Sequence, residues 1–209
     1  MPESDRPKAI QLATASEPLS LEEEYAMQAS WRNDSDKLTF IVCDPQTESA
    51  VGTSREAEVR TMVGDVNMFI SVQEDDDEDD ESRASLVGEL ELMIAQQDQQ
   101  RRGFGRAALV SFLQYILNHE KEVIKEFLTR EKPKGELPAT FSYFIVKIGQ
   151  DNQRSLALFE GLGFRKSSEK PSYFSEYELR HQGLSTEKVE GLLGNYRIER
   201  YKEVPYAFA

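Results

Sequence analysis

The distribution of hydrophobic and polar positions predicts one α/β domain in which strands and helices follow one another along the chain. Residues 85–95, SLVGELELMIA, alternate between apolar and polar side chains, as a strand with one apolar face does. Residues 141–150, FSYFIVKIGQ, are apolar enough for a central strand. Residues 37–44 and 62–72 have the β-branched and aromatic content of two more strands, and residues 164–180 are expected to form a closing hairpin.

Three segments carry helix signals. SEPLSLEEEYAMQASW contains an S-x-x-E capping box, which satisfies the free backbone groups at a helix start. DNQRSLALFEGLGF begins with Asp151 or Asn152 as an N-cap and ends in glycines. The segment after Gly105 follows the i, i+3, i+4, i+7, i+8 rule of an amphipathic helix. The apolar residues at those positions are Leu109, Phe112, Leu113, Ile116 and Leu117.

Two glutamates occupy the polar face of the alternating strand at residues 85–95. Its apolar face carries Leu90, Leu92 and Ile94. A strand in the middle of a sheet normally buries both faces. Glu89 and Glu91 therefore indicate either a solvent-exposed face or a polar active-site cleft, and the alternation alone leaves both open.

The loop QRRGFGR, residues 100–106, joins the end of this strand to the start of the next helix. A helix N-terminus offers free backbone N–H groups and the positive end of the helix dipole, which together bind anions. The two glycines let a ligand approach the backbone, and the three arginines add positive charge to an acidic protein. Short Gly-x-Gly turns are also common without a ligand, so this motif alone does not distinguish a phosphate cradle from a plain turn.

Charge is distributed unevenly along the chain. The formal net charge is −13, and the eight consecutive acidic residues from Glu74 to Glu81 leave −5 for the rest. Because like charges repel, residues 74–82 are expected to form a disordered acidic loop between two strands, although such a run also attracts basic peptides. Residues 119–139 form a second charged insertion, expected to be a helix extension followed by a surface loop. No basic stripe is present in the sequence, which argues against nucleic acid as a partner.

The cysteine and histidine content argues against disulfides and metal sites. Cys43, the single cysteine, lies in the apolar run LTFIVCD and is predicted to be a buried structural thiol. His119 and His181 lack metal-ligand partners at useful spacing and are predicted to be surface residues. With no signal-peptide pattern and no apolar run long enough to cross a bilayer, we expect a soluble protein without a membrane partner. Its expected location is the cytoplasm, with the nucleus as a second possibility.

Two motifs about fifty residues apart are far more discriminating together than either is alone. The first is Gln100-x-x-Gly103-x-Gly105, and the second is Asn152 followed by LFEGLGF. Their order, with a strand and a helix between them, resembles the GNAT superfamily of acetyl-CoA-dependent N-acetyltransferases. This resemblance implies an α/β (α+β) GNAT fold, with a mixed, mostly antiparallel sheet that splays between strands four and five and is flanked by helices. It covers residues 13–181 and leaves 182–209 as a polar C-terminal tail.

The resemblance also implies acetyl-CoA as cosubstrate, with no metal. The pantetheine arm would enter between the two splayed strands, and the pyrophosphate would meet the N–H groups of the glycine-rich loop. A backbone N–H near Ala95 would polarise the thioester carbonyl, as in an oxyanion hole. The implied cofactor-binding residues are Met93, Ile94, Ala95, Gln100, Arg101, Arg102, Gly103, Phe104, Gly105, Arg106, Asn152 and Phe159.

A strand-four glutamate eleven residues before the first motif position serves as general base in several GNAT enzymes. That position is Glu89 here, and Glu91 on the same face is the alternative. A carboxylate in a partly dehydrated cleft has a raised pKa and can take the proton of an amine directly or through water. The resemblance therefore favours the polar-cleft interpretation of the glutamate face.

Three features depart from the family pattern. Phe159 stands where a tyrosine often acts as general acid, which leaves protonation of the thiolate to solvent, Tyr143 or Tyr173. Lys147 occupies the second-strand position where other subfamilies place a base. The family's first strand and helix are expected to be missing, since only about a dozen polar residues precede the segment that matches.

The expected function is acetyl-CoA-dependent acetylation of a protein or peptide amine, with an N-terminal α-amine favoured over lysine. The alternative is a non-catalytic GNAT-fold module that binds acyl-CoA or a protein partner, an interpretation motivated by Phe159 and the short N-terminus. The sequence does not indicate an oligomeric state.

Overall fold

The computed structural model describes residues 19–44, 59–74, 84–132, 137–198 and 201–204. The chain divides into two compact units, residues 1–34 and 35–209. The predicted acidic loop at 74–82, from residue 75 onward, and the segment before residue 19 lie outside the described residues.

The first unit contains the helix α2 (Leu21–Asn33). The predicted capping box is confirmed: the backbone N–H of Ser20 donates to the Glu23 carboxylate at 2.8 Å, and the N–H of Glu23 donates to Ser20 Oγ at 3.3 Å. Three glutamates in the first turn also face the positive end of the helix dipole. None of the thirteen residues of this helix is buried, so the cap and the first-turn charges are its visible stabilising features.

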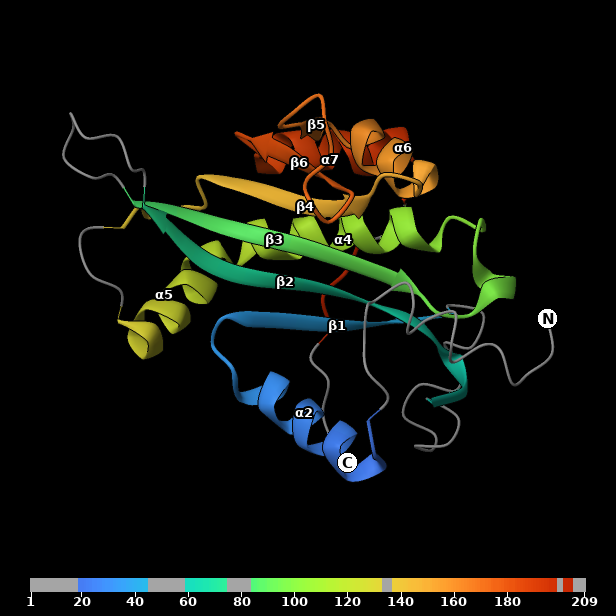
Figure 1. The fold of residues 1–209 in the computed structure, drawn as a ribbon, viewed down its shortest axis with the longest axis horizontal. Helices are drawn as coiled ribbons and strands as arrows, with labels where there is room; N and C mark the ends of the chain where they lie inside the picture. Colours follow the sequence, from blue (N-terminus) through green and yellow to red (C-terminus); the bar gives the residue numbers. More distant parts are fainter. Residues whose placement is uncertain (1–18, 45–58, 75–83, 133–136, 199–200, 205–209) are drawn as a thin grey trace. The chain divides into compact units, whose positions relative to one another are not determined.

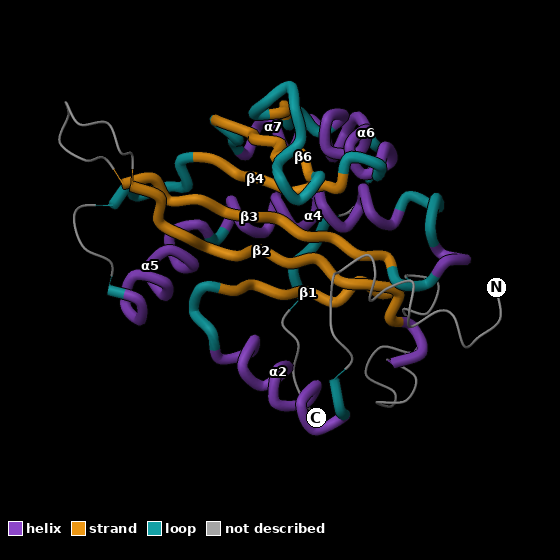
Figure 2. The backbone as a smooth tube through the Cα atoms, in the orientation of Figure 1, coloured by secondary structure: helices purple, strands orange, loops and turns teal. Residues whose placement is uncertain are grey.

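The second unit is organised around a mixed sheet with the strand order β1-β2-β3-β4-β6-β5 (Figure 1, Figure 2). Neighbouring strands run antiparallel except β3 and β4, which are parallel. The predicted mixed, mostly antiparallel sheet is therefore confirmed. The strands are β1 (Lys37–Cys43), β2 (Met62–Glu74), β3 (Ala84–Ile94), β4 (Tyr143–Gly149), β5 (Arg165–Lys166) and β6 (Glu176–Gln182).

Helices link the strands of this sheet. The crossover between the parallel strands β3 and β4 is helical, as parallel connections usually are. Its helices are α4 (Phe104–Asn118) and α5 (Glu120–Glu131), preceded by the short 3₁₀ turn Gln97–Gln99. After β4 come α6 (Gln153–Gly161) and, beyond β6, α7 (Thr186–Asn195).

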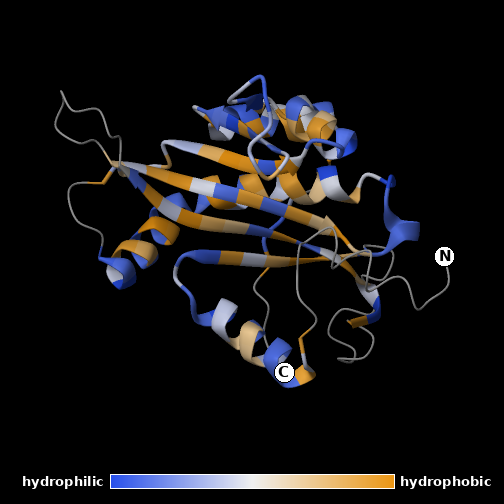
Figure 3. Cartoon of the chain, viewed as in Figure 1, coloured by the Kyte–Doolittle hydropathy of each residue, from blue (hydrophilic) through white to orange (hydrophobic). Residues whose placement is uncertain are grey.

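One face of the sheet carries the hydrophobic core. Met68 on β2 and Leu86 and Leu90 on β3 are fully buried there, against Leu109 and Leu113 of α4. Helices α5, α6 and α7 each add buried residues to the same cluster. In Figure 3, β4 is coloured largely as hydrophobic, in keeping with a strand buried on both faces. Burying one large aliphatic side chain stabilises the fold by about 1.5–3 kcal/mol.

Two expectations about burial were wrong. Cys43 is exposed, because it lies on β1, an edge strand of the sheet, rather than in a strand flanked on both sides. His181 is half-buried, with its ring packed edge-on against Phe164 at a centroid distance of 5.3 Å. Desolvation is the main cause of the lowered pKa of this histidine. An apolar run or a polar neighbourhood in the sequence therefore did not reveal whether a residue is exposed or buried in the sheet.

Residues 182–198, the described first part of the segment expected to be a polar tail, pack against the core. Their helix α7 is capped by Ser185 and buries Val189 completely, in the same core cluster as α4. The charged insertion at 119–139 likewise contains α5, which buries Ile124 and Phe127. Both helices are amphipathic, and their few apolar residues are sufficient to dock them on the core.

Candidate functional site

The sheet opens between β3 and β4. These parallel strands pair only along Val87 to Glu89 of β3, whereas β2 pairs with β3 along its whole length. Beyond Glu89, β3 continues to Ile94 and β4 to Gly149 without further pairing between them. The predicted splay is confirmed, and the C-terminal ends of both strands border the gap.

The hydrogen-bond alternation along β3 decides which backbone groups face the gap. The N–H of Ala95 donates to the Val63 carbonyl at 2.9 Å, in register with the β2–β3 ladder. Because antiparallel ladders alternate, Met93 also directs its backbone toward β2, while Leu92 and Ile94 direct theirs toward the gap.

This alternation changes the predicted path of the pantetheine arm. Of the predicted strand residues, Ile94 directs its backbone toward the gap, and so does Leu92, which the sequence reasoning did not include. The N–H of Ala95 is engaged by Val63 and so is not free to serve as the predicted oxyanion contact. The register of the β2–β3 pairing decides which residues of β3 direct their backbone toward the gap. The sequence of β3 alone does not show this register.

The glycine-rich loop is tied to the end of β3 and ends in a left-handed residue. Gln100 donates from Nε2 to the Ile94 carbonyl at 2.9 Å. Gly103, the N-cap of α4, has φ = 94°, and Arg101 has φ = 65°. Glycine adopts such a conformation without steric cost, so the Gly103 turn depends on its residue type.

The first turn of α4 presents backbone donors at the mouth of the gap. The first α-helical bond runs from the N–H of Ala107 to the Gly103 carbonyl at 3.0 Å. The N–H groups of residues 104–106 precede it and have no acceptor within the helix. A Cβ on Gly105 would lie 3.1 Å from Leu92 Cδ2, so this glycine lets the helix start close against β3. The geometry is that of an anion site.

The three loop arginines are exposed, and neighbouring side chains hold Arg102 and Arg106. Arg102 donates to the Gln99 side chain and lies 5.5 Å from the centroid of the Phe104 ring. Arg106 stacks on Tyr196 of the chain segment after α7, with 4.4 Å between its Cζ and the ring centroid. Their charges are available to phosphate groups at the helix start.

The two residues of the second motif have different environments. Asn152 is exposed and caps α6, with its Oδ1 accepting from the N–H of Ser155 at 3.1 Å. It follows the C-terminal end of β4, so it borders the same gap as the loop. Phe159 is only 3% exposed and packs edge-on against Phe164 in the core, which leaves it little surface for a ligand.

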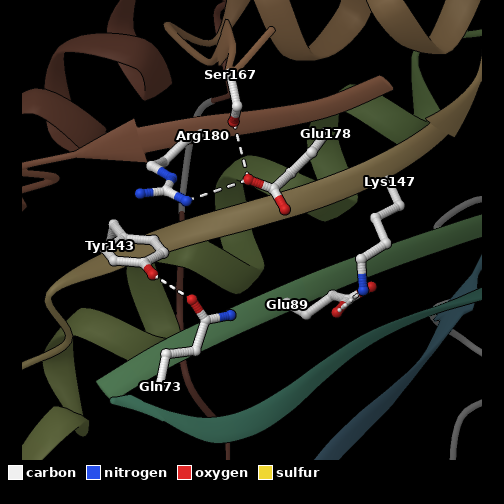
Figure 4. A network of polar contacts seen from close by, with 7 residues as sticks. All are labelled: Gln73, Glu89, Tyr143, Lys147, Ser167, Glu178 and Arg180. Atoms are coloured by element: carbon white, nitrogen blue, oxygen red, sulfur yellow. Dashed lines mark hydrogen bonds and ion pairs between the residues drawn. The ribbon is translucent and has the colours of Figure 1, made fainter. Parts of the chain in front are cut away.

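The face of the sheet opposite the core is polar near the gap. Glu89 forms an ion pair with Lys147 of β4, with 2.8 Å between Oε2 and Nζ (Figure 4). This hydrogen bond is the main cause of the raised pKa of Lys147. Lys147, which stands where other GNAT subfamilies place a base, therefore forms an ion pair with Glu89, one of the two predicted bases.

Glu91 lies two residues beyond the last β3–β4 pair and is exposed, yet its pKa is raised. Partial desolvation of its carboxyl group is the first cause, followed by repulsion from Glu89 and Asp65, and Lys147 opposes the shift. Asn67, directly across the β2–β3 ladder from Glu91, donates to Asp65 Oδ1 at 2.8 Å. Burial also raises the pKa of Asp65.

Asp65 and Glu91 are thus carboxyl groups on one face of adjacent strands, and repulsion from Asp65 favours the protonated form of Glu91. Asn67 is only 7% exposed, and its Oδ1 is buried without a hydrogen-bond partner. Sequence reasoning identified Glu91 but missed the two β2 residues, because their proximity comes from cross-strand register.

Tyr143, one of the candidate general acids, is engaged within the sheet. Its hydroxyl donates to Gln73 Oε1 at 2.6 Å, and the guanidinium of Arg180 stacks 4.0 Å from its ring centroid (Figure 4). Arg180 also reaches Glu178, which accepts from the Ser167 hydroxyl. Tyr173, the other candidate, is 98% exposed.

Among the residues that the structure describes, no group of three or more His, Cys, Asp and Glu side chains is placed to hold a metal ion. No helix found there is both long enough and apolar enough to cross a membrane.

Comparison with known proteins agrees with this geometry. A family model described as an acetyltransferase (GNAT) domain matches residues 5–165. The chain belongs to the GNAT acetyltransferase family. This membership confirms the resemblance recognised from the two motifs, and it makes the chain an acetyl-CoA-dependent acyltransferase.

Three relatives illustrate the similarity. The N-acetyltransferase 9-like protein of Schizosaccharomyces pombe is 35% identical over 194 residues, with 81% of each chain covered. Human alpha/beta-tubulin-N-acetyltransferase 9 is 36% identical over 172 residues, covering 82% of this chain and 68% of the human protein. The Drosophila melanogaster protein of that name is 40% identical over 151 residues, covering 72% and 62%.

Among solved structures, mutant forms of a spermidine/spermine N-acetyltransferase from Vibrio cholerae superpose with a TM-score of 0.50 and 15% identity. The match covers 91% of this chain and 95% of that chain. At this identity the similarity shows the GNAT fold alone.

Proposed function

We propose that this GNAT enzyme transfers the acetyl group of acetyl-CoA to the N-terminal α-amine of a protein, with α/β-tubulin as the first candidate acceptor. The names of the human and Drosophila relatives support a tubulin acceptor. The observation that carries the proposal is the position of Glu91, on the open polar face beside the gap and with a raised pKa.

The preference for an α-amine follows from proton affinity. An α-amino group has a pKa of about 7.7–8.0 and a lysine side chain one of about 10.4, so the α-amine is several hundredfold more often neutral at pH 7. A carboxylate is a weak base, even with a raised pKa. It can therefore deprotonate an α-ammonium group much more readily than a lysine ammonium group.

Glu91 is the better general base of the two candidates. The carboxylate of Glu89 is paired with the Lys147 ammonium at 2.8 Å, and taking up a proton would break that ion pair. Glu91 has no such contact with Lys147, and desolvation and two neighbouring carboxylates favour its protonated form. A base of this kind accepts a proton from an incoming ammonium group either directly or through water.

Acetyl transfer then proceeds by deprotonation of the amine, attack on the thioester and protonation of the departing thiolate. Glu91 takes the proton, the amine nitrogen attacks the thioester carbonyl carbon, a C–N bond forms and the C–S bond breaks. A thiol has a pKa of about 8.5, so the departing thiolate takes a proton from solvent without a dedicated side-chain acid. The burial of Phe159 and the hydrogen bond of Tyr143 to Gln73 fit this assignment.

The donor's phosphates have a natural place at residues 100–106. The N–H groups of the first turn of α4 and the exposed arginines supply donors and positive charge. A Cβ at Gly103 would meet no atom within 4 Å, so the space beside this residue is open. Leu92 would offer its backbone groups to the pantetheine arm, and Ile94 its N–H, because Gln100 already donates to the Ile94 carbonyl. Asn152 would contact the donor from the end of β4.

We also propose a cytoplasmic location. A chain with a single, exposed cysteine fits a reducing compartment, and a tubulin acceptor would be met there. Fluorescence microscopy of the tagged chain tests this proposal, and confinement to another compartment would overturn it.

The acceptor proposal is tested with purified tubulin dimers and two matched peptides, using mass spectrometry to locate the acetyl group. One peptide has a free α-amine and arginine in place of every lysine. The other has the same sequence with a blocked N-terminus and one lysine. We expect acetylation of a tubulin N-terminus and faster turnover of the first peptide. Faster turnover of the lysine peptide, or unmodified tubulin N-termini, would overturn the assignment.

A further inference from the structure

We propose that Tyr196 is a positioning residue for the CoA phosphate site, because it orders Arg106 in the first turn of α4. Tyr196 follows α7 and lies outside residues 5–165, the part of the chain that the GNAT family model matches. The inference rests on the proposed assignment of residues 100–106 to the CoA phosphates.

Tyr196 contacts both motif-bearing segments. Its ring lies under the guanidinium of Arg106, with 4.4 Å between Cζ and the ring centroid. Its hydroxyl donates to the Gly161 carbonyl at 2.9 Å, at the end of α6. One side chain therefore bridges the helix that follows the glycine-rich loop and the helix that Asn152 caps.

The ring itself is held in place by α7. The N–H of Tyr196 donates to the Leu192 carbonyl at 3.0 Å and closes the C-terminal end of that helix. Val189, one helical turn further back, is completely buried in the core cluster, and Tyr196 packs against the same cluster. The stacking surface is therefore a fixed part of the fold.

A stacked guanidinium keeps its N–H edge free. Arginine stacks on an aromatic ring through its face, while its in-plane donors can still bind phosphate oxygens. An exposed arginine alone would lose rotamer freedom on binding, and ordering it beforehand removes part of that cost. Arg106 lies only three residues after the Gly103 N-cap, so this ordering acts where the phosphates are expected.

The test measures acetyl-CoA binding by calorimetry, without an acceptor amine. We expect Tyr196→Leu and Arg106→Ala each to weaken binding about threefold to tenfold, the size of a cation–π contact. Tyr196→Phe keeps the ring and should stay closer to wild type. Glu190→Gln, an exposed change on α7, is the control and should leave affinity unchanged.

A double-mutant cycle separates positioning from general damage. If Tyr196 acts through Arg106, the combined Tyr196→Leu/Arg106→Ala variant binds no more weakly than Arg106→Ala alone. An equal further loss in the combined variant, or wild-type affinity in Tyr196→Leu, would overturn the role of Tyr196. Gly103→Asp reports on the loop separately: unchanged affinity in that variant would overturn the phosphate assignment, and the role of Tyr196 with it.

Discussion

The two faces of β3 have different environments near the gap. Leu86 and Leu90 are fully buried against the helices, whereas Glu89 and Glu91 point to the open face beside the gap. Successive side chains of a strand point to opposite faces, so residues one peptide bond apart belong to the core and to the face that carries the proposed base. In this enzyme, stability and catalysis should therefore separate along a single strand.

The largest expected effect is the loss of activity on changing Glu91, on the polar face of β3. Glu91→Gln removes the proposed base while keeping the size of the side chain, and we expect kcat/KM to fall by about 10²–10⁴-fold. The melting temperature and acetyl-CoA affinity should stay near wild type, because the residue is exposed. Steady-state kinetics, with thermal melting and calorimetry as controls, measure these quantities.

Glu89→Gln is the matched comparison for Glu91→Gln. It breaks the ion pair with Lys147 and leaves Glu91 intact, so its loss of activity should be the smaller of the two. If Glu89→Gln proves the more damaging change, the roles of the two carboxylates are reversed.

The next largest effect is the loss of stability on changing Leu90, on the face of β3 that packs against the core. Leu90 is completely buried, and Leu90→Ala should lower the free energy of unfolding by about 2–5 kcal/mol through lost burial and a residual cavity. Urea unfolding measures this change. The activity of the folded fraction should fall far less than in Glu91→Gln. A variant with wild-type stability and lost turnover would show that the two faces are not separable.

Local sequence signals predicted local structure. The Ser20–Glu23 capping box depends on residues three apart, and the helix after Gly105 on the spacing of its own apolar positions. The glycine-rich loop was found for the same reason, since a strand, a turn and a helix follow one another directly. These features need no knowledge of distant partners.

Features created by distant pairing could not be predicted. The ion pair between Glu89 and Lys147 joins residues 58 positions apart, and only the β3–β4 register brings them together. The exposure of Cys43 depends on β1 being an edge strand, and Tyr196 reaches Arg106 only because α7 packs on α4. Sequence patterns gave the candidates, and strand order and helix packing decided their roles.

The smallest effect concerns pH. Asp65 repels Glu91 across the sheet and helps to raise its pKa, alongside desolvation and Glu89, while Lys147 acts in the opposite direction. Asp65→Asn removes one negative charge and nearly preserves the shape of the side chain. Since the base must be ionised to act, a lower pKa keeps it active at lower pH.

The acidic limb of the kcat/KM profile of Asp65→Asn should therefore move to lower pH, with little change on the plateau. Asp98→Asn, the same charge change in the 3₁₀ turn after β3, controls for net charge and should leave the limb in place. Equal shifts in both variants would mean that overall charge sets the profile. A shift confined to Asp65→Asn would tie the proton to the pair of carboxylates on β2 and β3.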